Sequence, residues 1–367
     1  MVPISSVDLS GLKECRVALV YSLPQPNDPA NRWYDRWRTR VIMSYGEALE
    51  RLGAVPYYCD IDTFIDQIAN GKLNSCEAVV SLNAGVRPVS HFALVPAVAQ
   101  WFRKPIIPCT ADTIIAGERK DLGNSLASEA GLQVPRVYGP HEFAEAQAEA
   151  RLIVKPRDLG GSFGLKLVEG KTLEPSDFDG GKIVQAFVPG FDVTVPVFVD
   201  ANTNTLNVGD ATVYLPIHTD PTKWIYDRPA KEAYVGGSSV SKVTRRQYPL
   251  DPLTADRIRA YCTTVGVDCF ARIDFRLNVN DLGHVSRINL GDLAFVEINP
   301  MPTVCVGLAF VESIRSWVNR DAGAKHTLYC AGLSSDDDYD IIAYVLGHAL
   351  LRQLEPAKMD DRDQIGS

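Results

Sequence analysis

The sequence predicts an α/β protein with an N-terminal parallel sheet, a small β-rich central unit and a larger α+β C-terminal unit. Strand and helix patterns alternate over the first hundred or so residues, short apolar runs punctuated by glycine pairs follow Pro135, and two strands with alternating faces lie near the C-terminal end. We expect units over residues 1–115, 116–201 and 202–356, followed by a polar tail over 357–367 that we expect to be disordered.

The N-terminal unit reads as a βαβ arrangement. Strand patterns cover residues 16–21, 55–58 and 78–81, and apolar residues recur at helical spacing over 40–52, which predicts a parallel sheet. The loop 23–30 carries three prolines and none of the glycines that cradle a phosphate, and neither G-x-G-x-x-G nor G-x-x-x-x-G-K-[ST] occurs in the chain. We therefore expect the N-terminal loop to bind no nucleotide.

The central unit follows a helix predicted over 119–130, which ends at Gly131 because Pro135 forbids its continuation. Short apolar runs separated by glycine pairs and a Pro-Gly turn are typical of strands. We expect these strands over 152–155, 165–168, 182–187 and 193–199. Further helices are expected to continue to about Leu354.

Two segments, 271–276 and 295–300, carry the strongest chemical signal. Because side chains alternate along a strand, one face of each segment is polar and the other apolar. The polar faces carry Arg272, Asp274 and Arg276 on the first segment and Glu297 and Asn299 on the second. If the strands are neighbours, two carboxylates and an amide oxygen converge, a set that suits Mg²⁺. The pattern indicates a nucleotide enzyme.

Composition excludes several classes. The 367 residues are 46% hydrophobic and 22% charged, with a formal net charge of −8 and no long Lys/Arg run. A sequence-independent nucleic-acid surface or an anionic-membrane surface is therefore not expected. The longest apolar stretch, 92–102, is too short to span a membrane and is interrupted by Pro96. We expect no nucleic-acid or membrane partner.

The eight cysteines form no C-x-x-C pair and lie in apolar segments, so we expect buried thiols and a reducing cytoplasm. His91, His218 and His326 lack metal-ligand spacing and receive no role. No G-x-S-x-G nucleophile motif occurs.

Two further motifs bear on nucleotide binding. Lys155 ends a strand and precedes the glycine-rich turn 160–164, a pattern that brings backbone N–H groups and a point charge to phosphate oxygens but also occurs in ordinary hairpins. The strand 184–188 and Asp192 beyond its turn could read an adenine edge and ribose hydroxyls, or form a plain strand and turn.

In this order the segments from about 120 to 302 resemble the ATP-grasp fold, and specifically the D-alanine:D-alanine ligase family of carboxylate–amine ligases. The resemblance implies a pre-ATP-grasp N-terminal domain, a central lid, and ATP bound between the lid and the C-terminal unit. It implies two Mg²⁺ ions, which Mn²⁺ can replace, and a homodimer.

The resemblance also implies residue roles. Phosphate contacts fall to Lys120, Lys155, Lys231, Gly160, Gly161, Ser162 and Gly164. Adenine and ribose contacts fall to Gln185, Ala186, Val188 and Asp192. Asp274, Glu297 and Asn299 match the metal ligands, Arg272 matches the arginine that stabilises the acyl phosphate and tetrahedral intermediate, and Lys231 also counts as catalytic because it reaches the γ-phosphate. The alternative for Arg272 and Asp274 is a surface ion pair, worth ~0–1 kcal/mol.

The substrate side departs from the family pattern. Thr303 stands where the family has glycine, Leu308 stands where a serine would hold the second D-alanine, and the segment 22–27 lacks the glutamate that would hold the first. We expect an ATP-dependent ligase that joins amino-acid-like substrates through an acyl phosphate. The alternatives are a true D-alanine:D-alanine ligase, an ATP-grasp kinase and a nucleotide-binding protein without turnover.

Overall fold

A parallel sheet forms the N-terminal part of the computed structural model, which describes residues 7–23, 39–82, 89–217, 220, 223–227 and 243–355. Its order is β2-β1-β3-β4, and all neighbours are parallel, as the sequence predicts. Residues 17–20 of β1 are buried on both faces because helices cover both sides of the sheet. The strands are β1 (Arg16–Tyr21), β2 (Val55–Asp60), β3 (Ala78–Leu82) and β4 (Ile106–Ile107).

Among the described residues, six helices accompany this sheet and lead into the next unit. They are α1 (Thr39–Arg51), α2 (Ile61–Ala69), α3 (Val89–Phe92), α4 (Leu94–Trp101), α5 (Ala111–Glu118) and α6 (Lys120–Glu129). The apolar stretch 92–102 largely forms α4, and Pro96 is tolerated there because it lies in the first turn. No helix in the described part of the chain is long and apolar enough to cross a membrane.

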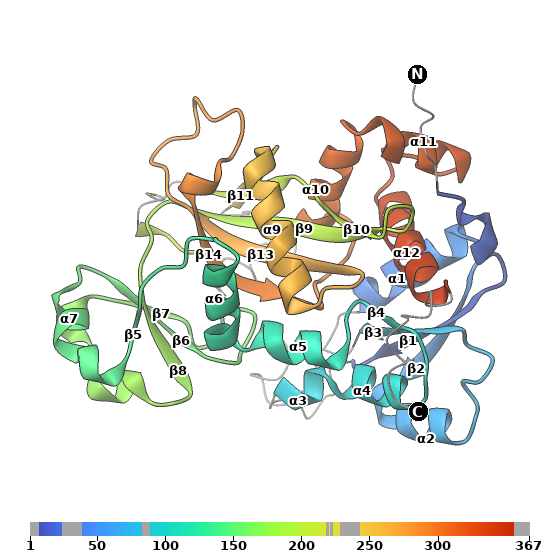
Figure 1. The fold of residues 1–367 in the computed structure, drawn as a ribbon, viewed down its shortest axis with the longest axis horizontal. Helices are drawn as coiled ribbons and strands as arrows, with labels where there is room; N and C mark the ends of the chain where they lie inside the picture. The colour runs from blue at the N-terminus through green and yellow to red at the C-terminus, as the bar shows by residue number, and fades with distance from the viewer. Residues whose placement is uncertain are drawn as a thin grey trace, which may run out of the picture.

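A small antiparallel sheet of order β5-β8-β6-β7 follows, and it lies at the left of Figure 1 together with α7 (Phe143–Ala148). Its apolar side chains form a separate small core around Leu152 and Val184. Its strands are β5 (Val137–Tyr138), β6 (Leu152–Pro156), β7 (Lys166–Val168) and β8 (Lys182–Ala186).

The large sheet has the order β12-β11-β9-β13-β14, with β10 paired to β9. The long strand β9, which the sequence analysis groups with the central unit, pairs here with β11 and β13, because its apolar residues fill the core of the large sheet. The strands are β9 (Phe191–Asp200), β10 (Thr205–Val208), β11 (Ala211–Pro216), β12 (Val243–Tyr248), β13 (Phe270–Leu277) and β14 (Leu293–Asn299).

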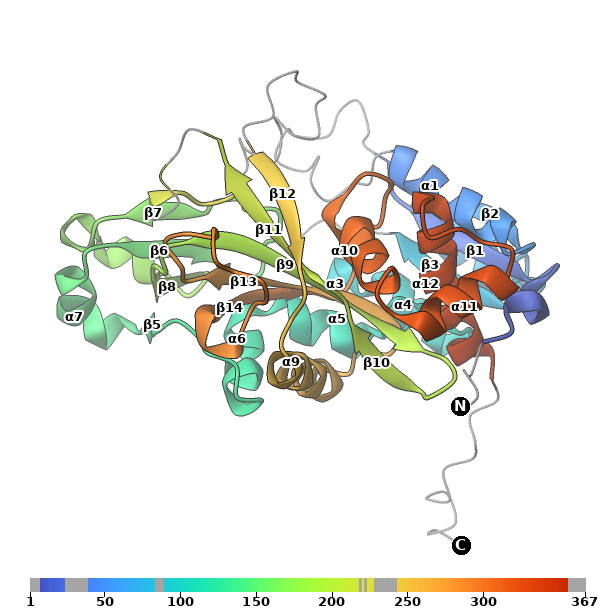
Figure 2. The ribbon, with the colours of Figure 1, turned by 90° about the horizontal axis from the view of Figure 1, so that it is seen from above.

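Helices cover the two faces of the large sheet differently. Figure 2 shows α5, α6 and α9 (Pro252–Val265) along one face, where they bury the apolar side of the strands. Asp251 caps the start of α9 and Gly266, at φ +88°, ends it. On the other face, α10 (Ala309–Val318) and α12 (Asp338–Leu354) pack against one end of the sheet, and α11 (Ala322–Cys330) lies beside them.

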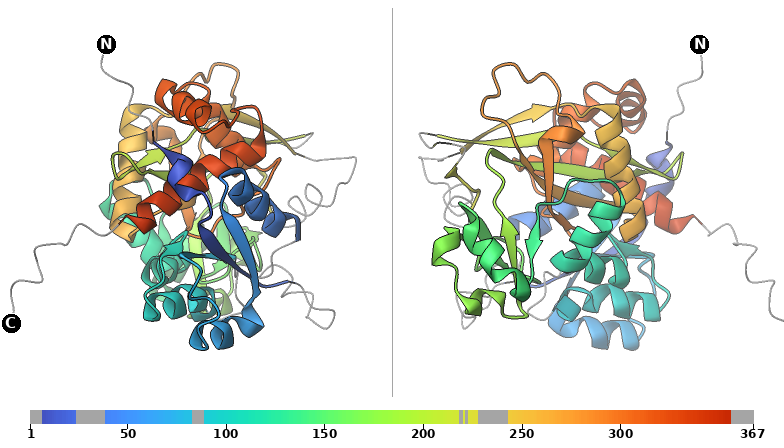
Figure 3. Two further views of the ribbon diagram at one scale, coloured as in Figure 1. Left: turned by 90° about the vertical axis from the view of Figure 1, so that its right-hand side faces the viewer. Right: turned by 60° about the vertical axis from the view of Figure 1, so that its left-hand side comes forward.

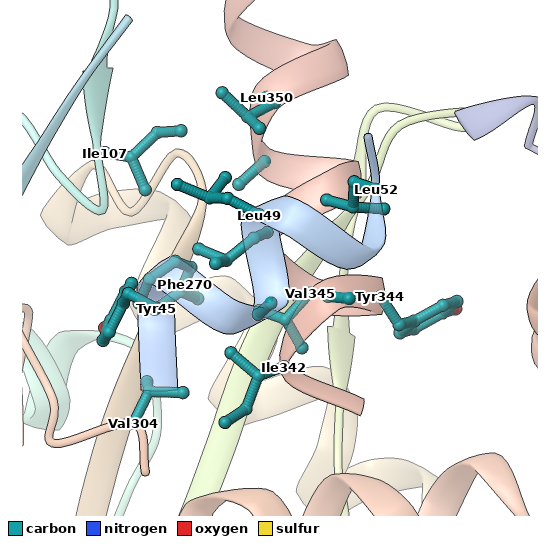
Figure 4. Close-up of a cluster of buried hydrophobic side chains, with 14 of the residues drawn as sticks. Tyr45, Leu49, Leu52, Ile107, Phe270, Val304, Ile342, Tyr344, Val345 and Leu350 are labelled. Carbon is teal, nitrogen blue, oxygen red and sulfur yellow. The ribbon is translucent and has the colours of Figure 1, made fainter. Parts of the chain in front are cut away.

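The C-terminal helices share one core with the N-terminal unit. Tyr45 and Leu49 of α1 belong to the same buried cluster as Ile342 and Val345 of α12, and Figure 4 shows the two helices crossing in this cluster. In Figure 3 the red helices of the C-terminal part lie directly beside the blue N-terminal elements. The packing joins the two ends of the described chain, while the predicted domain boundaries themselves stay a prediction.

All eight cysteines are free thiols, and seven of them are buried as expected. The prediction is wrong for Cys330, which is exposed. The buried residues of α11 are Ala324, Thr327 and Leu328, and Cys330 lies off that face, with its Sγ 3.6 Å from His326 Nε2.

Gly190 occupies a turn that admits no side chain. Its φ is +116°, and a Cβ atom there would lie 1.9 Å from the carbonyl oxygen of Leu277. We expect Gly190→Ala to lower the free energy of unfolding by about 2–4 kcal/mol because backbone must move. Urea denaturation measures this, and Gly180→Ala, where the added Cβ would meet no heavy atom within 4 Å beyond the adjacent residues, is the matched control. Equal stabilities of the two variants would contradict the expectation.

Candidate functional site

One face of the large sheet is polar beyond the end that packs against α10 and α12. On β9 this face changes from Phe198, which packs against Trp317 and Tyr344, to Thr194 and Asp192. Side chains that share this face continue the polar surface across the neighbouring strands. They are Arg272, Asp274 and Arg276 on β13 and Glu297 and Asn299 on β14. The structure thus brings the two predicted strands together as direct neighbours.

Asp274 is the centre of this surface. Arg272 donates two parallel hydrogen bonds to its carboxylate, Nε to Oδ1 at 2.9 Å and Nη2 to Oδ2 at 2.8 Å. Asn299 donates from Nδ2 to Oδ2 at 3.0 Å, and the Thr194 hydroxyl donates to Oδ1. Burial lowers the pKa of Arg272, but the neighbouring carboxylate of Asp274 raises it and outweighs burial. The pKa of Arg272 therefore lies above its ordinary value. Arg272 is therefore a permanent cation in a fixed fork geometry.

A β-bulge aims Glu297 into the site. Asp274 lies opposite Glu297, whereas the next residue, Phe275, lies opposite Phe295, so Val296 has no register partner. The extra residue lets Phe295 enter the apolar core while Glu297, two positions on, faces the polar side. The bulge also turns the Val296 carbonyl toward Lys155, whose Nζ donates to it at 3.3 Å.

Two buried lysines converge on the same strand from different elements. Lys120, the first residue of α6, pairs with Glu297 at 3.2 Å and donates to the carbonyl of Leu159 at 2.7 Å. Lys155 projects from β6 of the small sheet, and both side chains are about 95% buried, at 5% and 4% exposed. A buried ammonium is costly without anions, so the pair is suited to an anionic ligand.

Lys155 provides a pH-dependent prediction. Burial lowers the pKa of Lys155 to about 8; Glu297 opposes this shift and Lys120 adds to it. Phosphate oxygens favour the protonated ammonium, so binding above pH 8 requires proton uptake and weakens as pH rises. We expect ADP affinity to fall about tenfold between about pH 7 and pH 9. A fluorescence titration measures it.

Lys155→Arg is the control for this titration, because a guanidinium stays protonated over the same range. Its ADP affinity is expected to stay nearly constant with pH. An equal decline in both proteins would show that another group causes the dependence.

The glycine-rich turn connects β6 to β7. Gly161, Ser162 and Gly164 have φ of +65°, +60° and +67°, so the turn adopts the left-handed backbone that glycine favours. The hydroxyl of Ser162 donates to the carbonyl of Tyr226 at 3.4 Å, and no heavy atom lies within 4 Å of a Cβ built on Gly160. The turn therefore combines an open backbone with a contact to the segment 223–227.

The predicted adenine edge follows β8. Gln185 is buried and its Nε2 donates to the carbonyl of Pro135 at 3.2 Å, while the Ala186 N–H donates to the carbonyl of Arg136. The carbonyl of Val188 accepts a hydrogen bond from Arg276. The side chain of Gln185 is thus hydrogen-bonded beside the small sheet, and the Val188 carbonyl is hydrogen-bonded to Arg276 of the large sheet.

Asp192 lies at the start of β9, beside this edge. Its Oδ2 accepts from Nη1 of Arg276 at 2.7 Å and from the Tyr226 N–H at 2.7 Å. Sequence reasoning placed Arg276 on the polar face but gave it no role, and it missed Thr194. The alternating pattern of β13 was the available signal for Arg276, whereas Thr194 faces Asp274 only through the pairing of β9 with β13.

Lys231, the remaining predicted site residue, lies outside the described residues. In the described part of the chain no group of three or more His, Cys, Asp and Glu residues could hold a metal ion. The oxygen donors of Asp274, Glu297 and Asn299 nevertheless fit Mg²⁺, a hard cation that completes its shell with water and phosphate oxygens. These three side chains therefore fit a Mg²⁺ site whose ligand shell is completed only when a phosphate binds.

Comparison with known proteins decides the family. The protein-family model that describes the ATP-grasp domain matches residues 119–304, just over half of the chain. The chain belongs to the ATP-grasp family. The matched residues include every predicted site residue and the two strands of the polar face. A search of curated proteins finds no significant match.

Solved structures show the same fold as this ATP-grasp chain. A D-alanine–D-alanine ligase from Bacillus anthracis complexed with ATP is similar at a TM-score of 0.60 and 12% identity, covering 93% of this chain and 100% of its own. A D-Ala:D-Ser ligase from Enterococcus faecalis gives 0.57 and 13%, covering 92% and 100%. D-alanyl-alanine synthetase A from Vibrio cholerae gives 0.56 and 10%, covering 89% and 99%. The resemblance in fold is confirmed.

The ATP-grasp chain departs from the ligase pattern where α10 begins. Leu308 is the N-cap residue of α10 and makes no side-chain capping hydrogen bond. The N–H of Gly307 donates to Asp338 at 2.7 Å, and its carbonyl accepts from Arg245 at 3.1 Å. The backbone N–H and carbonyl of Gly307 are therefore hydrogen-bonded within the protein, and Leu308, the next residue, offers no hydroxyl to a substrate.

Proposed function

We propose that this protein is an ATP-dependent ligase that activates a carboxylate as an acyl phosphate and couples it to an amine, releasing ADP and phosphate. One observation carries the proposal: a bidentate Arg272–Asp274 pair and Glu297 lie on adjacent strands, and two buried lysines reach the same strand from separate elements. Phosphoryl transfer to a carboxylate depends on such charge neutralisation more than on covalent help.

In this proposal, different cationic side chains neutralise different parts of the negative charge of the reactants. Lys120 and Lys155 would neutralise the ATP phosphates from within a buried environment, where each contact is stronger than in water. The turn 160–164 would cover the phosphates and exclude water, which would otherwise hydrolyse the acyl phosphate. Lys231 remains a proposed γ-phosphate contact.

Arg272 would act at the acyl carbon. Its Nη1, which takes no part in the two hydrogen bonds to Asp274, would donate to an oxygen of the acyl phosphate and to the oxyanion that forms when the amine attacks, a contribution of ~3 kcal/mol for one donor. Asp274, Glu297 and Asn299 would hold Mg²⁺, which supplies Lewis-acid stabilisation of the phosphate charge when bound. The proposal of two ions follows from the family resemblance.

The substrates are proposed to be amino-acid-like, and the geometry at α10 argues against D-alanyl-D-alanine as the product. Leu308 offers no hydroxyl where the family resemblance predicts a serine, so the carboxylate of a second D-alanine would lack that donor. The homodimer and the cytoplasmic location remain proposals; free thiols throughout the described chain favour the latter.

Incubation with ATP, Mg²⁺ and pools of amino acids tests the proposal. We expect ADP and phosphate to appear in equal amounts only when a carboxylate and an amine are both present, with an amide whose mass is the sum of the two less one water. Liquid chromatography with mass spectrometry detects the amide. A stable phosphorylated product would instead identify a kinase, and nucleotide binding without any turnover would identify a binding protein.

A further inference from the structure

Arg276 makes an extensive set of side-chain hydrogen bonds near the proposed nucleotide edge. Its side chain is 7% exposed, and three of its nitrogens contact four acceptors. Nε donates to the Val188 carbonyl at 3.0 Å and Nη1 to Asp192 Oδ2 at 2.7 Å. Nη2 donates to the carbonyls of Gly190 at 2.6 Å and Trp224 at 3.0 Å.

These contacts connect three separate segments. Val188 and Gly190 belong to the turn after β8, Asp192 is the second residue of β9, and Trp224 belongs to the segment 223–227 after β11. The guanidinium also lies 5.4 Å from the centroid of the Phe187 ring. Only a planar fork can satisfy acceptors in so many directions, so lysine cannot replace it.

The carboxylate of Asp192 is held asymmetrically as a result. Both of its hydrogen bonds, from Arg276 and from the Tyr226 N–H, go to Oδ2. Among the described residues, Oδ1 accepts no hydrogen bond. A carboxylate fixed by one oxygen keeps the lone pairs of the other for a ligand donor, at no further cost in side-chain entropy.

We propose that Arg276 is a positioning residue for nucleotide selection: it fixes Asp192 so that Oδ1 accepts hydrogen bonds from the ribose hydroxyls of the nucleotide. The inference rests on the proposed function, because it requires a nucleotide at this edge. The chemical class selected is a ribonucleotide, and the group that discriminates is the pair of 2′- and 3′-hydroxyls. Hydrogen bonds to a charged acceptor are strong enough to produce discrimination of tenfold or more.

Isothermal titration of ADP and 2′,3′-dideoxy-ADP tests this selection, since the second nucleotide lacks both hydroxyls. We expect the wild-type protein to bind ADP about 10–100-fold more tightly. In Arg276→Met, Asp192 loses its anchor, so ADP binding is expected to weaken about tenfold or more while dideoxy-ADP binding changes less than about threefold. The ratio of the two affinities therefore collapses.

A merely structural role for Arg276 gives a different result. If Arg276 only supported the turn, both nucleotides would weaken equally and the ratio would be unchanged, which would overturn the inference. Asp192→Asn keeps the shape and an acceptor for Arg276, and it is expected to lose the same ratio; it provides the test if Arg276→Met fails to fold. An unchanged ratio in a folded Asp192→Asn protein would also overturn the inference. Absence of ADP binding in the wild type would instead overturn the proposed function.

Discussion

Replacing Asp274 with asparagine is expected to reduce ATP-dependent turnover by about 10³-fold, because under the proposed function the change removes the charge of a metal ligand, worth several kcal/mol of transition-state stabilisation. The same carboxylate receives hydrogen bonds from Arg272, Asn299 and Thr194, so it also holds the site together. Steady-state ADP release at saturating substrates measures the effect. Addition of more Mg²⁺ is expected to restore little of the activity.

Asp256→Asn is the matched control for this variant. Asp256 is 67% exposed on α9 and pairs with Arg259 three residues on, a surface ion pair worth ~0–1 kcal/mol. We expect its turnover to equal that of the wild type. Full activity of a folded Asp274→Asn protein would show that the polar face of β13 is not the reaction site.

Replacing Arg272 with methionine is expected to lower kcat by about 10²–10³-fold with little change in the KM for ATP, because one oxyanion donor contributes ~3 kcal/mol in the transition state. Arg272→Lys keeps the charge but loses the fork that binds both oxygens of Asp274. Its kcat is expected to lie between those of the wild type and Arg272→Met. Single-turnover measurements of ADP formation and amide formation separate the two chemical steps.

A loss confined to the KM for ATP would contradict the role of Arg272 at the acyl carbon. Arg259→Lys is the control for the chemical change, since Arg259 is 39% exposed and lies on α9. We expect this control to retain wild-type kcat. The comparison distinguishes loss of the fork at β13 from a general effect of removing a guanidinium.

Much of the fold could be predicted because local patterns agree with the final structure. The strand β1 has the predicted bounds, and helix α6 ends at Glu129, two residues before Gly131, whose φ is positive, as the glycine and Pro135 indicate. The polar face of β13, and the common side of Glu297 and Asn299 on β14, follow from side-chain alternation. The alternation brings Arg272, Asp274, Glu297 and Asn299 to one surface.

The remainder depends on contacts that are distant in sequence. The bulge at Val296 breaks the alternation of a regular strand, and it lets Phe295 and Glu297 face opposite sides. Thr194 meets Asp274 across a strand pairing that spans eighty positions. The strand β9 joins the large sheet because that sheet buries it on both faces, and no local pattern distinguishes this from pairing in the small sheet.

Oxygen transfer tests the central claim most directly. Amino-acid pools labelled with ¹⁸O in their carboxylates are incubated with ATP, Mg²⁺ and the protein, and the released phosphate is analysed by mass spectrometry. Formation of an acyl phosphate followed by amine attack transfers one carboxylate oxygen to phosphate, so we expect phosphate carrying one ¹⁸O together with the amide. Phosphate released without ¹⁸O, in the presence of a newly formed amide, would contradict activation of the carboxylate by ATP at this site.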